Sequence, residues 1–226
     1  MVKTVETGTF PVSKNNQVRK TSRRSMPREV RREQLILATI KCIEKNGLSG
    51  TTMAQVTREA GLSLGIANLH FESKEKLLVD TLEYVTEEYN RGLAAIMADE
   101  RYESTASRIE AVLKFDFSPA IVRKDKLAVW VAFWGESRAR PTYQRICTRS
   151  DLSAEDAMGK LFQVAIDEGG YKHQDAAVLA SGYTAVVDGL WLDLLLCPAH
   201  LTKKKARRVA RNYLANALPD HIPQEP

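Results

Sequence analysis

The stretch TTMAQVTREAGLSLGIANLHF, Thr51–Phe71, constrains this chain more than any other part of it. Apolar residues recur at helical spacing in its first half, and Gly61 supplies the permissive backbone that ends a short helix. Ser63 is placed to cap a second short helix, which we expect over Leu64–His70. The tight Gly-Leu-Ser turn between them predicts a helix-turn-helix in which the two helices meet at a steep angle.

The second of these helices has a composition that suits the major groove of DNA. Gly65 and Ala67 are small enough to permit close approach to a duplex, and the residues that follow them offer both polar and apolar contacts. Because an ordinary helical hairpin in a globular core uses the same turn, the motif alone leaves both interpretations open.

The adjoining segment HFESKEKLL favours DNA binding. Ser73 is placed to cap a further helix, Lys74 to meet a phosphate, and Phe71 with Leu77 to bury the joint between the helices. The residues that we expect at the DNA are Thr52, Ser63, Leu64, Gly65, Ile66, Asn68, Leu69, His70 and Lys74.

Basic residues are concentrated beside this motif. Residues 1–32 carry nine Lys or Arg against two Glu, a balance of +7, whereas the remainder of the chain is slightly acidic at −2. Such a stretch favours phosphate polymers through counterion release, although charge runs are equally common in solvated tails. Residues 1–27 show no helical or strand periodicity, so we expect a flexible extension in which Arg23 and Arg24 are available to a minor groove.

The rest of the chain keeps a helical pattern, and no segment alternates like a strand. Ser153 with Asp156 resembles a capping box, which predicts a new helix from Ala154. The expected helices outside the central motif are Glu29–Asn46, Lys74–Ala98, Ala106–Phe115, Ala120–Ser137, Thr142–Thr148, Ala154–Glu168, Gln174–Leu196 and Thr202–Ala217.

The predicted fold is all-α with two domains. An N-terminal three-helix domain with the helix-turn-helix occupies residues 28–73, and a C-terminal helical domain for ligand binding and dimerisation occupies residues 74–218. The basic extension at residues 1–27 precedes them, and a tail at residues 219–226 follows.

Several other classes of protein are disfavoured. The cysteines Cys42, Cys147 and Cys197 are widely separated in apolar surroundings, so we expect reduced core residues in a cytoplasm. The most apolar run, Gly189–Cys197, is too short to span a bilayer, so we predict no membrane insertion. The four histidines have no metal-ligand spacing and no catalytic or phosphate-loop motif is present, so we expect no enzyme, no metal and no cofactor.

All three tryptophans lie in the second domain, in two aromatic clusters. Trp130, Phe133 and Trp134 follow helical spacing that we interpret as one shared face, and Asp188 is three residues from Trp191. Aromatic faces beside a carboxylate suit a quaternary ammonium ion, which has no hydrogen to donate and is held by π faces and a negative charge.

Aromatic stripes on helices belong to a core more often than to a binding site, and Asp188 is what favours a site here. An ionised carboxylate among apolar neighbours is costly without a partner, which is a ligand cation, an arginine such as Arg138 or Arg140, or a helix N-terminus. The predicted effector-binding residues are Trp130, Phe133, Trp134, Tyr143, Asp188 and Trp191.

The N-terminal motif resembles the TetR family of bacterial repressors over Arg31–Leu82. Asn68 departs from the family pattern, which commonly has an aromatic residue there that supports contact with the DNA backbone, so its own phosphate contact is in doubt. The residues that carry the resemblance are Gly47, Thr52, Ala60, Gly61, Ser63, Gly65, His70, Phe71, Lys74 and Leu77.

The C-terminal domain resembles the branch of that family that responds to choline. Three runs carry this likeness: KFDFSPA (Lys114–Ala120), AVWVAFWGESRARPTYQRI (Ala128–Ile146) and VVDGLWL (Val186–Leu192). The resemblance implies a homodimer on double-stranded operator DNA that controls choline oxidation and uptake and is loosened by choline or a related quaternary ammonium. It also implies that the last two helices form the dimer interface. A sensor of another amine or cationic drug that controls efflux, and an enzyme acting on a quaternary amine, are the alternatives.

Overall fold

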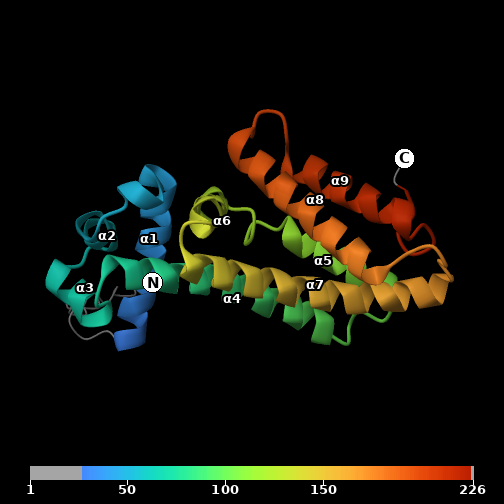
Figure 1. The fold of residues 1–226 in the computed structure, drawn as a ribbon, viewed down its shortest axis with the longest axis horizontal. Coiled ribbons are helices and arrows are strands. Elements are labelled where there is room, and N and C mark those ends of the chain that lie inside the picture. The colour runs from blue at the N-terminus through green and yellow to red at the C-terminus, as the bar shows by residue number, and fades with distance from the viewer. Residues whose placement is uncertain (1–26, 225–226) are drawn as a thin grey trace, which may run out of the picture.

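The computed structural model describes residues 27–224, and in this range it contains nine α-helices and no strand (Figure 1). The predicted flexible extension, with Arg23 and Arg24, lies almost wholly outside the described residues. The helices are α1 (Arg28–Gly50), α2 (Met53–Ala60), α3 (Leu64–His70), α4 (Lys74–Ala98), α5 (Thr105–Asp116), α6 (Lys124–Ser137), α7 (Pro141–Gly169), α8 (Ala176–Leu196) and α9 (Lys203–Ala217). The all-α prediction is confirmed.

Helices α1 to α3 form a small head at one end of an elongated molecule, and the first turns of α4 pack against it (Figure 1). Within α1, Gly47 has a φ of 69°, so the helix breaks there and the chain turns toward α2. Phe71 and Leu77 are both buried at the joint between the head and α4, as predicted. The buried Asp80 accepts bonds from Arg32 at 2.7 Å and Lys76 at 2.6 Å, which ties α4 to α1.

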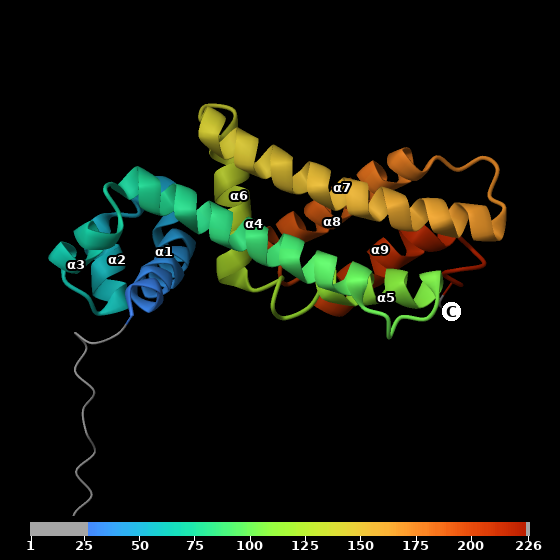
Figure 2. The same ribbon diagram turned by 90° about the horizontal axis from the view of Figure 1, so that it is seen from below.

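The remaining helices form the second domain. Helices α4 and α7 run side by side along its length, and α8 packs against both α7 and α9 (Figures 1 and 2). Figure 2 shows α6 crossing α4 at a steep angle and meeting the start of α7, between the head and the rest of the second domain. Because α6 contacts α1 on one side and α8 on the other, it joins the two domains.

The predicted break before Ala154 is wrong. Helix α7 is continuous over Pro141–Gly169, and Ser153 is an exposed residue within it. Ser150, Ala154 and Met158 are four residues apart and all buried, so one inward face runs through the supposed break. The local capping signal is outweighed because burial of this face stabilises the uninterrupted helix.

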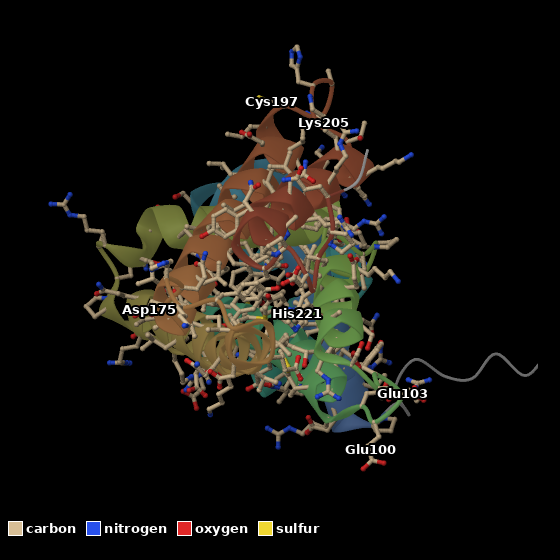
Figure 3. All side chains as sticks on the ribbon, turned by 90° about the vertical axis from the view of Figure 1, so that its right-hand side faces the viewer. Glu100, Glu103, Asp175, Cys197, Lys205 and His221 are labelled. Atoms are coloured by element: carbon tan, nitrogen blue, oxygen red, sulfur yellow. The ribbon has the colours of Figure 1, made fainter. Side chains whose placement is uncertain are left out.

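Three smaller differences from the prediction concern the start of one helix, the end of another and the C-terminal tail. Helix α6 begins at Lys124, four residues after the predicted start. Cys197 is exposed where α8 ends, at the outer edge of the end-on view in Figure 3, so only Cys42 and Cys147 are core residues. In the predicted tail, Ile222 is fully buried, so the described part of that segment packs onto the domain.

Helix α8 is the one helix of the described residues that is long and apolar enough to cross a membrane. Core helices of soluble proteins pass the same test, so the absence of membrane insertion stays a prediction. In the single chain, Val178 is 69% exposed and Leu196 is 64% exposed, so α8 presents apolar surface that this chain does not cover.

Candidate functional site

Two hydroxyl caps fix the geometry of the helix-turn-helix. The Thr52 side chain accepts a hydrogen bond from the Gln55 amide at 3.3 Å, and the Gln55 side chain accepts one from the Thr52 amide at 2.8 Å. Gly61 ends α2 with a φ of 63°, and the Ser63 hydroxyl accepts from the Ile66 amide at 3.3 Å at the start of α3. The turn therefore directs one face of α3 outward.

That outward face carries most of the residues predicted to contact DNA. Ala67 is fully buried against the head, whereas Leu69 is 75% exposed and Asn68 is exposed beside it. An exposed surface that combines amide, hydroxyl and aliphatic groups offers both hydrogen bonds to base edges and contact with thymine methyls. Of the predicted residues, Ile66, His70 and Lys74 are partly buried, and the exposed ones are Thr52, Ser63, Leu64, Gly65, Asn68 and Leu69.

The start of α1 brings positive charge to the end of α3. The pKa of His70 is lowered, first by burial and then by nearby Arg28, so His70 tends toward its neutral form. Arg28 is exposed on the head, and the predicted site did not include it. The signal that pointed to it was the concentration of basic residues up to residue 32, which favours phosphate contact.

A second site lies in the other domain, between α4, α6, α7 and α8. About 450 Å³ of empty space lies between these helices, a figure that includes open solvent at the mouth of the pocket. It is lined by Tyr89, Trp130, Trp134, Ser150, Asp151, Ala154, Met158, Tyr183, Thr184, Val187, Asp188 and Trp191.

Aromatic rings form much of the wall of this pocket. The ring of Trp130 lies 5.8 Å from that of Trp134 and 6.2 Å from that of Trp191, centroid to centroid. Tyr89 packs edge-on against Trp191 at 5.6 Å. Because these rings come from α4, α6 and α8, the aromatic wall depends on the packing of three helices.

Two carboxylates face the same pocket without a basic neighbour. Among the described residues, neither Asp151 nor Asp188 makes a hydrogen bond or an ion pair. Burial, then the charge of Asp151, raises the pKa of Asp188 to about 7, and burial raises that of Asp151 to about 6. Of the two arginines expected as alternative partners for Asp188, Arg140 is instead paired with Glu75 at 3.0 Å, and Arg138 does not line the pocket.

Behind the pocket, Asp116 joins three helices. It is fully buried at the end of α5 and accepts hydrogen bonds from the hydroxyls of Tyr183 at 2.6 Å and Tyr89 at 3.0 Å. The indole nitrogen of Trp191 donates to its main-chain oxygen at 3.0 Å. Burial raises the pKa of Asp116 to about 6, and the two tyrosine hydrogen bonds oppose that rise. Three side chains of the pocket wall are thereby held by one residue.

Comparison with known proteins identifies the family. Residues 105–219 match the family described as the C-terminal part of BetI-type transcriptional repressors. Residues 35–81 match the family described as bacterial regulatory proteins, tetR family. The chain belongs to the TetR family. Its C-terminal domain is of the BetI type, and the protein is therefore a transcriptional repressor of that kind.

Curated relatives of this BetI-type regulator span nearly its whole length. The HTH-type transcriptional regulator BetI of Burkholderia mallei is 33% identical over 204 residues, which cover 86% of this chain and 97% of the relative. The regulator BetI 2 of Chromohalobacter salexigens is 31% identical over 189 residues, which cover 84% and 89%.

Solved structures share the fold. A putative transcriptional regulator from Pseudomonas aeruginosa PAO1 is 26% identical with a TM-score of 0.75 and covers 93% of this chain and 100% of its own. A putative regulator from Saccharomonospora viridis, solved in complex with choline, is 21% identical with a TM-score of 0.68 and covers 82% and 96%.

In this BetI-type regulator, four of the six predicted effector residues line the pocket: Trp130, Trp134, Asp188 and Trp191. The other two lie elsewhere, because Phe133 and Tyr143 are fully buried and pack edge-to-face at 4.8 Å. Successive residues of an α-helix point about 100° apart, so Phe133 and Trp134 do not share a direction and the predicted common face is wrong. Phe133 and Tyr143 serve the core between α6 and α7.

Eight lining residues of the BetI-type pocket were missed. Four of them lie on α7, where their spacing marks one face, but the predicted break placed Ser150 and Asp151 in a connection between two helices. Thr184 and Val187 lie four residues before Asp188 and Trp191, a signal that the sequence did contain. The missed residues are Tyr89, Ser150, Asp151, Ala154, Met158, Tyr183, Thr184 and Val187.

Proposed function

We propose that this repressor controls genes for choline oxidation and uptake, and that choline or a related quaternary ammonium is its effector. The observation that carries the proposal is a pocket lined both by three tryptophan rings and by two carboxylates that have no partner among the described residues. A cation–π contact contributes about 0.5 to 2 kcal/mol, so two or three of them with one charge pair suffice for micromolar affinity. The Saccharomonospora viridis regulator, solved with choline, supports this because it shares the fold.

The repressor acts as a homodimer on double-stranded operator DNA. A single head contacts too little DNA for high specificity, whereas paired heads read two half-sites about one helical turn apart. The exposed apolar residues Val178 and Leu196 of α8 and Val209 of α9 supply a surface for a second copy, in line with TetR-family regulators, which typically dimerise.

Effector binding reaches the DNA through the helices that line the pocket. Tyr89 belongs to α4, which begins at the head, and Trp130 belongs to α6, which packs against α1 of the head. A cation that moves these two helices changes the spacing of the paired heads. Coupling of about 1 to 3 kcal/mol gives a useful change in operator affinity.

The test is binding of the purified full-length protein to its own upstream DNA, followed by fluorescence anisotropy at fixed salt with and without choline. We expect saturable, sequence-specific binding that choline weakens by about tenfold or more. Specific binding that responds to a bulky aromatic cation but not to choline would indicate a drug sensor instead. Turnover of choline by the pure protein would indicate an enzyme, and an absence of specific DNA binding would contradict the repressor.

A further inference from the structure

Asp151 and Asp188 reach one pocket from two different helices. Asp151 lies in the middle of α7 and Asp188 in the middle of α8, and both line the pocket that the tryptophans also line. One carboxylate is enough to balance a single quaternary ammonium ion. The second therefore needs an explanation of its own, because a half-buried carboxylate without a partner is unfavourable.

The groups that surround this pair are acidic or neutral. Helix α5 contributes Asp116 behind the two tyrosines, and α7 contributes Glu155, which accepts a hydrogen bond from the Ser181 hydroxyl at 3.0 Å. Helix α4 contributes Tyr89, α8 contributes Tyr183, and α6 contributes only tryptophans. No Lys, Arg or His is among the described residues that line the pocket, so no positively charged side chain there attracts an anion.

We propose that Asp151 is a second effector-binding residue, which selects ligands by net charge by accepting a cation and excluding a zwitterion that carries a carboxylate. This inference rests on the proposed function and deepens it. A neutral hydroxyl on the ligand donates a hydrogen bond to a carboxylate, whereas a ligand carboxylate at the same place meets Asp151 with like charge and loses its water. Repulsion between like charges, rather than the shape of the pocket, thus excludes the zwitterion.

The test compares two trimethylammonium ligands that differ in the charge of their other polar group. Choline carries a hydroxyl and glycine betaine a carboxylate, and both are titrated against full-length protein by calorimetry at pH 8. We expect wild type to prefer choline by about a hundredfold. The variant Asp151→Asn should bind choline about tenfold more weakly and glycine betaine more tightly, so that the preference narrows by about tenfold or more.

A matched control stands on the same helix. Asp156 is exposed and pairs with Lys160 at 2.6 Å, so Asp156→Asn removes the same charge from α7 at the surface and should leave both affinities at the wild-type level. Thermal melts of both variants show whether they are folded. Because Asn replaces a carboxylate that lacks a partner with a neutral group of equal size, Asp151→Asn should melt no lower than wild type.

The outcomes separate this inference from the proposed function. If wild type binds choline and Asp151→Asn keeps both its affinity and its preference, the role of Asp151 is overturned and the proposed function stands. If wild type binds no choline, both are overturned. A loss of affinity seen with choline but not with tetramethylammonium, which has no hydroxyl, would support the hydrogen bond from the ligand hydroxyl to Asp151.

Discussion

The Tyr183 hydroxyl donates a 2.6 Å hydrogen bond to the carboxylate of Asp116, and this bond joins α8 to the end of α5 inside the second domain. Tyr89 of α4 donates to the other oxygen of the same carboxylate. A single buried acid therefore sets the positions of two pocket rings that come from different helices.

Removal of this hydrogen bond should destabilise the domain. In Tyr183→Phe the ring stays and the donor is lost, so the buried Asp116 keeps one of its two tyrosine partners. We expect the free energy of unfolding to fall by about 1 to 3 kcal/mol. Urea denaturation at pH 8 measures it, with Asn212→Ala, at an exposed residue of α9, as a surface control.

Effector affinity should depend on pH. The pKa of Asp188 is raised to about 7 and that of Asp151 to about 6, so both carboxylates are ionised at pH 8 and become neutral as the pH falls through this window. A neutral carboxyl does not attract a cation, so choline should bind about tenfold or more weakly at pH 5.5 than at pH 8. Tryptophan fluorescence titrations measure this, and an affinity that is constant over the range would contradict the role of these groups.

The variant Asp188→Asn should stabilise the protein when no ligand is present. The folded-state pKa of Asp188 lies above its unfolded value of 3.8, so the folded state binds more protons between about pH 4 and pH 7 and its stability falls as the pH rises through that window. Asn removes this penalty. We expect a gain of about 1 to 3 kcal/mol at pH 8 and almost none at pH 4. Equal stability of variant and wild type at pH 8 would show that the charge is already satisfied.

Two neighbouring aromatic residues should give opposite phenotypes. Trp134 lines the pocket, so Trp134→Ala should weaken choline binding by about tenfold, the loss of one cation–π contact and its packing. Phe133 is fully buried against Tyr143, so Phe133→Leu should lower stability while choline affinity stays near wild type. Melting curves and ligand titrations on both variants separate the two roles.

The outward face of α3 should govern DNA affinity alone. Asn68 is exposed and outside the core, so Asn68→Ala should weaken binding to the operator by about 1 to 3 kcal/mol without a change in melting temperature. Ala67 is fully buried one position earlier, so Ala67→Leu should destabilise the head instead. An operator affinity of Asn68→Ala equal to wild type would place the contact on other residues of α3.

The structure of the helix-turn-helix in the head could be predicted from interactions between residues close together in the sequence. Gly61 and Ser63 act through backbone conformation and a neighbouring amide, so their structural roles follow from residues within a few positions of them. The pocket is different because its residues meet only through the packing of four helices. Trp130 and Trp191 could be predicted because aromatic faces beside the carboxylate of Asp188 suit a cation.

Asp151 was missed for a specific physical reason. The capping signal at Ser153 is local, whereas the inward face that keeps α7 continuous depends on burial against other helices. With the supposed break in place, Asp151 fell in a connection and had no predicted direction. Phe133 was wrongly predicted to line the pocket because helical spacing alone was taken to place it on the same face as Trp134. As consecutive residues of a helix, the two side chains point about 100° apart.

The unpaired carboxylates of Asp151 and Asp188 raise the question of where the counter-charge inside the second domain comes from. A folded chain ordinarily supplies the counter-charge of each acid that it encloses, and here the described residues leave that charge to be supplied from outside. The cation that we propose as the effector supplies this charge, as a lysine or arginine side chain would. Ligand binding then completes the charge balance of the domain's interior, and it does so only when the cation is present in the surroundings.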